Sequence, residues 1–400
     1  MPAENNELIL LPAVRARYDT EGRLTLTHKY LSGSHLYATH WPGPVTSLVS
    51  LTDRISYDMD QVPVTEDPLH RIELRPESRS ALASRLQGAG LVFSFLSREE
   101  AFLSPLCRQL DLPLVYTSEY TPRTEMQIID ATVRNPLRRA RSKLWTMRTE
   151  HKRRVSLRGA AGLQCSGTPA YEHYRRFHDN LLLFFDNRVP QSQVITEQQL
   201  SQRLSQLRPG GKLRLVFGGR LIAMKGVLDL PAFAGALAQL GVDFQLDIYG
   251  QGDLEGELKR RIADAGLQDR VALRGILEFA AGWIPRLQQE ADLFICCHPQ
   301  GDPSSTYPEV MSCGVPIVGY ANEAFEGIVS RSGSGWLVPM GDVQGLAQQV
   351  AALAMHTDEV ARHAHLARLF AAAHAFEPTF ARRAEHLLQS QARHLARAVT

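Results

Sequence analysis

The stretch that decides the fold reads ADLFICCHPQGDPSSTYPEVMSCGVPIV and covers residues 291–318. Leu293–Cys297 is a short apolar run without charge, as expected of a strand that is buried on both faces. The run 300–308 is rich in Gly, Pro, Asp and Ser, which predicts a loop. A helix is expected next and is ended by Gly314. The residues that can cap its beginning are Ser304, Ser305 and Thr306.

This order of strand, polar loop and helix is typical of an anion-binding site. The first N–H groups of a helix have no partner within the helix, and the helix dipole is positive at that end. We therefore expect a phosphate group to bind near Ser305 and Thr306. Glu309 follows one turn later, where it would reach a sugar hydroxyl attached to that phosphate. Val315–Tyr320 reads as the next strand, so the stretch predicts an α/β fold.

The run Glu309–Val318 resembles the EAMACG-P-V-V run of the retaining GT4-type (group 1) glycosyltransferases, which have the GT-B fold. The resemblance implies two Rossmann-like domains with parallel sheets facing a central cleft, and it implies that Glu309 binds ribose hydroxyls of a nucleotide sugar. The family usually carries a second glutamate eight positions earlier. That position is Gly301 here, with Asp302 beside it. Either Asp302 takes over the contact to the donor hexose, or the contact is absent.

A second run supports the same resemblance. Lys212–Phe217 is predicted to be a strand, and the residues after it resemble the family's G-R-L…K-G signature. Arg220 and Lys225 would converge across a tight loop and neutralise a diphosphate, so no metal and no cofactor is implied beyond a nucleotide-sugar donor, most simply a UDP- or GDP-sugar. The resemblance assigns further donor contacts to Gly219, Gly250, Gly275 and Leu277.

The length and composition indicate how many domains the chain has and argue against several other classes of protein. A chain of 400 residues suits two domains of about 200 each. The net charge of +2 gives no general attraction to nucleic acid, and no nucleic-acid-binding motif is present. The five cysteines are odd in number, and Cys296 and Cys297 are adjacent, which favours a reducing compartment over disulfides. The N-terminus is not typical of a signal peptide, and no apolar run could span a bilayer. We expect a cytoplasmic protein, or one peripheral to the inner face of the membrane.

The resemblance to the GT4-type enzymes implies that the N-terminal half binds the acceptor. Short strands alternate with helical stretches there, which predicts another parallel sheet. The segment 27–45 is dense in His, Tyr and Trp and suits a carbohydrate surface through His35, His40 and Trp41; the alternative is a helix, a turn and partly buried aromatic residues. Glu119 ends a predicted strand and would orient the acceptor or act on its proton; the alternative is a solvent-exposed glutamate.

The segment 134–158 contains ten arginines and lysines against Glu150 alone, together with several apolar residues. One interpretation is an amphipathic helix on anionic lipid headgroups, which would suit a lipid-linked acceptor. A second is recognition of an acidic acceptor, and a third is a solvated basic helix face over the domain core.

The predicted division is an acceptor domain over 1–205, a nucleotide-sugar domain over 206–375, and a C-terminal helix over 376–400 that packs back on the first domain. A polar linker is expected over 191–211, and a break between the last two helices at Glu377-Pro378. The predicted function is metal-independent transfer of a hexose, with retention, to a glycan, lipid-linked or small-molecule acceptor. The alternatives are a degenerate nucleotide-sugar-binding protein, a two-lobed small-ligand-binding protein and, less favoured, an epimerase.

Overall fold

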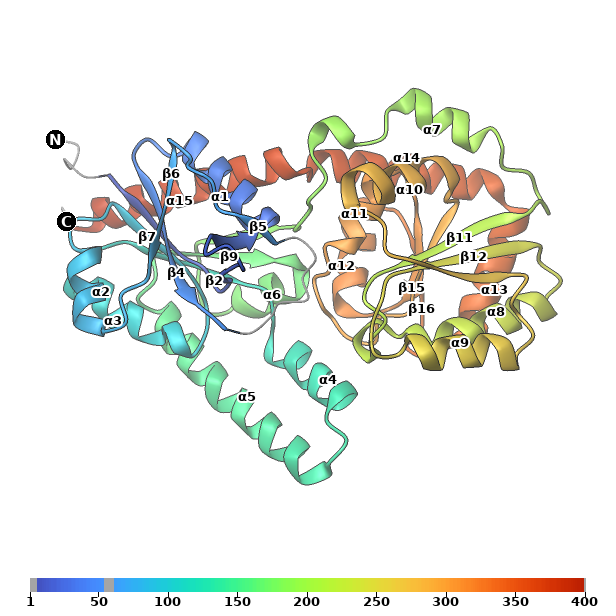
Figure 1. The fold of residues 1–400 in the computed structure, drawn as a ribbon, viewed down its shortest axis with the longest axis horizontal. Helices are drawn as coiled ribbons and strands as arrows, with labels where there is room; N and C mark the ends of the chain where they lie inside the picture. Colours follow the sequence, from blue (N-terminus) through green and yellow to red (C-terminus); the bar gives the residue numbers. More distant parts are fainter. Residues whose placement is uncertain (1–5, 54–60, 399–400) are drawn as a thin grey trace.

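The computed structural model describes residues 6–53 and 61–398, and Figure 1 shows two α/β domains side by side. Over the described residues, the first domain has a ten-stranded sheet with the order β10-β9-β8-β7-β1-β4-β2-β3-β5, and β6 pairs with β4. The strands from β10 to β4 along this order are parallel. The strand bounds are Leu8–Leu11 (β1), Arg15–Tyr18 (β2), Leu24–Thr27 (β3), Val45–Leu51 (β4), Gln61–Pro63 (β5), His70–Leu74 (β6), Leu91–Phe95 (β7), Leu114–Ser118 (β8), Gly162–Ser166 (β9) and Leu181–Phe184 (β10).

Helices cover both faces of this sheet, so alternate residues of its central strand enter two different cores. Ile9 and Leu11 of β1 pack with residues of α2 and α3, whereas Leu8 and Leu10 pack with residues of α1 and α15. The helices of the first half of the chain are His28–His40 (α1), Arg79–Leu86 (α2), Glu99–Phe102 (η1), Leu103–Gln109 (α3), Pro122–Thr132 (α4), Pro136–Leu157 (α5), Gly167–Tyr174 (α6), Gln191–Gln193 (η2) and Glu197–Leu204 (α7).

The second domain has a six-stranded parallel sheet, again counted over the described residues, with the order β13-β12-β11-β14-β15-β16. Its strand β14 is the apolar run predicted above: Leu293 and Ile295 enter one core and Phe294 and Cys296 the other. The strand bounds are Leu213–Gly218 (β11), Phe244–Tyr249 (β12), Val271–Gly275 (β13), Leu293–Cys296 (β14), Ile317–Tyr320 (β15) and Trp336–Val338 (β16).

The helices around the second sheet follow the strands in βα order. The last helix, α15, leaves this domain and runs back along the first one, where it lies against α1 (Figure 1). Gly33 of α1 permits this close approach, because a Cβ atom there would lie 2.5 Å from Cζ of Phe380. The helix bounds are Ala223–Lys225 (η3), Val227–Asp229 (η4), Leu230–Gln239 (α8), Glu255–Asp264 (α9), Phe279–Trp283 (η5), Ile284–Glu290 (α10), Thr306–Ser312 (α11), Glu323–Ser332 (α12), Val343–Met355 (α13), Thr357–Ala373 (α14) and Phe376–Ala398 (α15).

The predicted fold class, two domains with largely parallel sheets and covering helices, is confirmed. The segment 191–211, predicted to be the inter-domain linker, lies between β10 of the first sheet and β11 of the second. It contains α7, which begins with a capping box at Thr196 and is anchored to the second domain by Arg203, whose guanidinium donates to the carbonyl of Cys313. One local prediction was wrong. The break between the last helices lies at His374 and Ala375; Pro378 is tolerated inside the first turn of α15, where no helical N–H is needed.

Candidate active site

Glycines hold the carboxyl ends of three strands of the second domain close together. The N–H of Gly219 donates to the carbonyl of Tyr249 at 3.1 Å, and the N–H of Gly250 donates to the carbonyl of Gly275 at 2.7 Å. Gly250 has a φ of +132°, and a Cβ atom there would lie 1.9 Å from the carbonyl oxygen of Gly219. The loops after β11, β12 and β13 therefore form one surface at the end of the sheet, where ligands bind in open α/β folds.

A tight turn brings Lys225 to this surface. Gly226 has a φ of +62°, and a side chain there would collide with the carbonyl of Cys297 at 1.9 Å, so this turn presses against the end of β14. Lys225 itself is 7% exposed. Its Nζ donates to Oγ of Ser304 at 3.1 Å and lies 3.3 Å from Oδ2 of Asp302.

Arg220 reaches the same place from the end of β11. Burial raises the pKa of Tyr120, the charge of Asp302 raises it further, and the charge of Arg220 lowers it, so both charges act on Tyr120. Within the part of the chain that the structure describes, the guanidinium of Arg220 has no hydrogen bond or ion pair. The structure thus brings together the two predicted cations and Asp302.

Glu309 is held in a different way from the one expected. It lies on α11, is 4% exposed, and accepts from Nε of Arg188 at 2.7 Å. The guanidinium of Arg188 also lies over the ring of Phe279, with Cζ 4.1 Å from the ring centre. Leu277 packs on the same side, in the core cluster that includes Phe279. Glu309, through Arg188, and Leu277 are therefore both connected to the segment around Phe279.

The start of α11 is close to the prediction. Ser305 is the N-cap residue, its side chain makes no capping bond, and Thr306 is the first helical residue. The Oγ of Ser304 donates to Oγ1 of Thr306 at 3.1 Å, which links the helix start to Lys225.

Gly301 is a contact point between the two domains. Its N–H donates to Oε1 of Gln127 at 3.0 Å, and Gln127 and Arg123, both on α4, bind the carboxylate of Glu323 at 3.1 Å and 2.5 Å. A Cβ atom at Gly301 would lie 2.6 Å from Oε2 of Glu323. The space beside Gly301 is thus occupied by a glutamate from α12.

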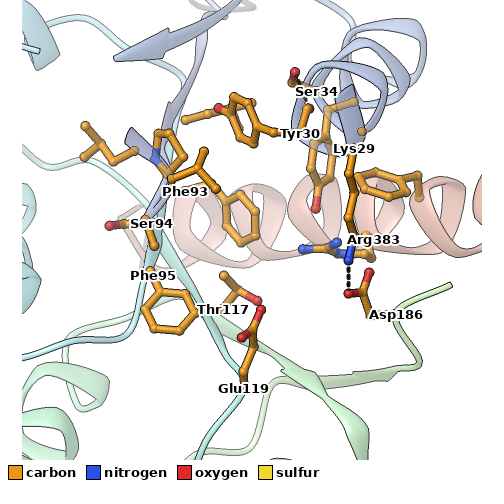
Figure 2. Close-up of a pocket in the computed structure, with 18 of the residues that line it drawn as sticks. Lys29, Tyr30, Ser34, Phe93, Ser94, Phe95, Thr117, Glu119, Asp186 and Arg383 are labelled. Carbon is orange, nitrogen blue, oxygen red and sulfur yellow. Dashed lines mark hydrogen bonds and ion pairs between the residues drawn. The ribbon is translucent and has the colours of Figure 1, made fainter. Parts of the chain in front are cut away.

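The first domain contains a cavity of about 540 Å³ beside this site. It is formed by α1, α15 and the carboxyl ends of β1, β7, β8 and β10, and Figure 2 shows the side chains that enter it. Lys29 of α1 is paired with Asp186, which follows β10, and Arg383 projects from α15. The aromatic lining consists of Tyr30, Tyr37, Phe93, Phe95, Phe184 and Phe380.

Two carboxylates with opposite pKa shifts face this cavity. For Glu119, loss of water contact caused by the surrounding protein raises the pKa, and the charge of Asp186 raises it further. Its side chain is nevertheless exposed to the open cavity. For Asp186, burial acts to raise the pKa, but the charges of Lys29 and Arg383 outweigh it and lower the pKa. Glu119 is the carboxyl group that gains a proton first as the pH falls.

The cavity and the donor-side loop are neighbours. Asp186 also lines a small crevice with Pro303 and Ser304, and the charge of Asp302 contributes to the raised pKa of Glu119. The predicted acceptor residue Glu119 and the predicted donor residue Asp302 are therefore brought together.

The three acceptor residues predicted on the aromatic segment do not line the cavity. His35 is bonded to Asp67 at 2.7 Å, His40 is exposed, and Trp41 is a core residue whose Nε1 donates to the carbonyl of Asn6 at 2.8 Å. The segment is the helix of the alternative interpretation, α1, and its opposite face lines the cavity.

The sequence analysis did not predict four charged residues of the site: Lys29, Asp186, Arg188 and Arg383. Asp186 and Arg188 follow directly after an apolar strand, and charged residues at a strand end are a signal that could have found them. Arg383 gave no signal, because only the path of α15 brings it to the cavity.

Two further searches of the described residues gave negative results. No group of three or more His, Cys, Asp or Glu side chains is arranged to hold a metal ion there. In the same residues, every helix is too short or too polar to pass through a lipid bilayer.

Residues 212–356 match the model of the family described as "Glycosyl transferases group 1". Among curated proteins, the chain is 35% identical over 141 residues to the amylovoran biosynthesis glycosyltransferase AmsK of Erwinia amylovora, covering 34% of each chain. It is 32% identical over 151 residues to the GDP-mannose:cellobiosyl-diphosphopolyprenol alpha-mannosyltransferase of Xanthomonas oryzae pv. oryzae, covering 37% of this chain and 39% of that one. The matched part thus spans a little over a third of these relatives.

Solved structures match nearly the whole chain. Sucrose-phosphate synthase from Thermosynechococcus elongatus superposes with a TM-score of 0.64 at 16% identity, covering 98% of this chain and 100% of that one. The structure of Anabaena Alr3699/HepE in complex with UDP also superposes with a TM-score of 0.64, at 15% identity, and the match covers 96% of this chain and 100% of that one. The fold is therefore that of the GT-B glycosyltransferases, and within it residues 212–356 are similar to the group 1 glycosyltransferases.

Proposed function

We propose that this protein is a retaining glycosyltransferase that moves a hexose from a nucleotide sugar to a hydroxyl group of an acceptor, without a metal ion. The observation that carries the proposal is the contact of Lys225 with Asp302 at the ends of parallel strands, beside a cavity in the opposite domain, with the charge of Arg220 acting on the neighbouring Tyr120. Two cations at the ends of these strands suit a diphosphate, and the adjacent cavity leaves room for a second substrate.

In the proposed donor complex, Arg220, Lys225 and the N–H groups at Ser305 and Thr306 bind the diphosphate. Asp302 contacts the hexose, and Glu309 binds ribose hydroxyls. The glycine-rich surface at Gly219, Gly250 and Gly275 lets the backbone approach the nucleotide closely, and Leu277 contacts the base. Fixed cations stabilise the charge that develops as the nucleoside diphosphate leaves, which accelerates the reaction rather than only strengthening binding.

The acceptor is proposed to occupy the cavity of the first domain, with its reacting hydroxyl near Glu119. Carboxylates accept hydrogen bonds from sugar hydroxyls, and the aromatic side chains suit the C–H faces of a sugar ring. A volume of about 540 Å³ is sufficient for an acceptor of one or two sugar units.

In the proposed reaction, the bond between the anomeric carbon and the phosphate oxygen breaks, and the acceptor oxygen bonds to that carbon on the same face. The acceptor proton passes to the leaving phosphate, as the resemblance to retaining enzymes implies. Glu119 is assigned the role of orienting the acceptor hydroxyl.

The nucleotide is proposed to be UDP or GDP. One structural neighbour, Anabaena Alr3699/HepE, was solved in complex with UDP-glucose, and the name of one relative specifies GDP-mannose. A thermal-shift panel of UDP-, GDP-, ADP- and TDP-sugars tests the choice, because a ligand at 100 times its dissociation constant adds about 2.7 kcal/mol of stability. A shift with one nucleotide and its sugar is expected. The absence of any shift at millimolar concentrations would contradict the proposal.

A second candidate is a protein that binds a nucleotide sugar without turning it over. It is favoured by Gly301, where related enzymes usually have a glutamate. A donor-hydrolysis assay without acceptor distinguishes the two: slow release of nucleoside diphosphate supports the enzyme, and thermal stabilisation without any release supports the binding protein.

A further inference from the structure

Helices α4 and α5 extend away from the two domains as a hairpin (Figure 1). Ion pairs join them: Lys143 binds Asp130 at 2.7 Å, and the largely buried Arg153 binds Glu125 at 2.6 Å. The 22 residues of α5 therefore form a supported helix about 33 Å long, with one face against the protein and the other outward.

The outward face of α5 carries several exposed apolar side chains among its cations. The exposed fractions are 81% for Leu137, 50% for Leu144 and 48% for Val155. At 100° per residue these three side chains fall on one line along the helix, and Met147, 60% exposed, lies beside it. Five of the seventeen exposed large apolar side chains of the described chain lie on α5. The fifth is Trp145, on which the guanidinium of Arg98 stacks at 3.9 Å.

Cations flank this apolar line. On the helical wheel, Arg148, Arg141 and Lys152 lie about 20°, 40° and 60° from Leu137, all on the same side. Within the described residues, six cations of the segment 134–158 make no ion pair, whereas Arg139, Lys143, Arg153 and Arg154 do. The six are Arg134, Arg138, Arg141, Arg148, Lys152 and Arg158.

We propose that α5 docks the protein onto an anionic lipid surface. The helix lies flat in the plane of the headgroups, with its apolar line in the acyl boundary and its flanking cations on lipid phosphates. Long basic side chains suit this position, because their stems cover apolar surface while the charge stays at the headgroups. Nucleic acid would also neutralise the cations, but it would leave Leu137, Leu144 and Val155 in water. The proposal does not depend on the proposed reaction.

Vesicle flotation tests the proposal. The full chain is expected to float with phosphatidylglycerol-containing vesicles at low salt, to float less as salt rises, and to stay behind with pure phosphatidylcholine. The variant R141E/R148E/K152E should lose binding at least about tenfold, since each cation contributes. The variant L137S/L144S/V155S should also bind more weakly, because it keeps every charge but loses the apolar line.

Matched controls lie on other helices and loops. K212E/K259E/R260E makes the same change in net charge at exposed positions of the second domain, and L240S/M355S/L369S removes three apolar side chains of the second domain that are 49–59% exposed. Both control variants are expected to float like the wild type, and circular dichroism checks that every variant is folded.

A second readout places the contact on α5. Brominated phosphatidylglycerol should quench tryptophan fluorescence in the wild type, and the quenching should largely disappear in W145F. Failure of the wild type to float at low salt would overturn the proposal. So would equal losses in the α5 and control variants, or binding of a DNA duplex without binding of vesicles.

Discussion

Arg188 donates from Nε to Oε1 of Glu309 across 2.7 Å, and this pair joins the segment after β10 to the helix that opens the donor site. The carboxylate of Glu309 is 5% exposed and Arg188 is 33% exposed. A carboxylate with so little water around it needs a charged partner. Arg188 therefore fixes the position of the Glu309 carboxylate.

Removing Arg188 should destabilise the protein. R188M leaves the nearly buried charge of Glu309 without its partner, and we expect a loss of about 2 kcal/mol in the free energy of unfolding, measured with urea. The control is R175M, which breaks the ion pair of Arg175 with Glu172, where both side chains are more than half exposed. The control should change stability by less than about 1 kcal/mol. Equal losses in the two variants would contradict this account.

Removing the two cations should abolish sugar transfer. R220A and K225A are each expected to lower kcat/KM for the donor about 10²-fold, and the double variant more, because in the proposed reaction both side chains stabilise the leaving diphosphate. Steady-state assays measure the effect, and K259A, an exposed lysine of the same domain, is the control. Near-normal turnover in the double variant would refute the assignment.

The raised pKa of Glu119 should make stability depend on pH. Folding favours the protonated form of Glu119, so its contribution to stability is present below about pH 4.5, the ordinary value, and is lost as the pH rises through the raised pKa. E119Q should therefore unfold at a higher temperature than the wild type at pH 7, and the difference should vanish as the pH falls below about 4.5. A difference that stays constant over this range in thermal unfolding would show that the cause is not ionisation.

The same variant tests the acceptor role. E119Q should lower the rate of sugar transfer, while leaving unchanged the thermal shift produced by the donor nucleotide. A weakened donor response would place Glu119 in the donor site instead.

Gly301 and Glu323 should be energetically coupled. In G301A the new methyl group displaces the carboxylate of Glu323 from Arg123 and Gln127, so we expect a loss of about 1–2 kcal/mol. In the background of E323A that carboxylate is absent, and G301A should cost much less. A double-mutant cycle of unfolding free energies measures the difference, and additive losses would contradict the contact.

The fold could be predicted from the sequence wherever the residue pattern of a single segment is enough to identify its helix or strand. The run Leu293–Cys297 shows both its strand and its two-sided burial, and Gly314 ends the helix after it. Pro378 misled the prediction of the last helix break, since a proline in the first turn of a helix and a proline after its end look alike in sequence.

The site was only partly predictable for a related reason. Lys225 and Asp302 lie in segments with recognisable patterns, and the structure places their charged atoms 3.3 Å apart. The cavity depends on contacts between distant elements: Lys29 with Asp186, and Arg383 projecting from α15. His35 and His40 have the residue types of a sugar site but lie on the wrong face of α1, because the helix phase is set by packing of Tyr37 and Trp41 in the core.

The most direct test is a crystal structure of the protein with UDP or GDP bound. The account predicts diphosphate oxygens within hydrogen-bond distance of both Arg220 and Lys225, with the ribose beside Glu309. A nucleotide bound elsewhere, with Arg220 and Lys225 away from its phosphates, would contradict the central claim.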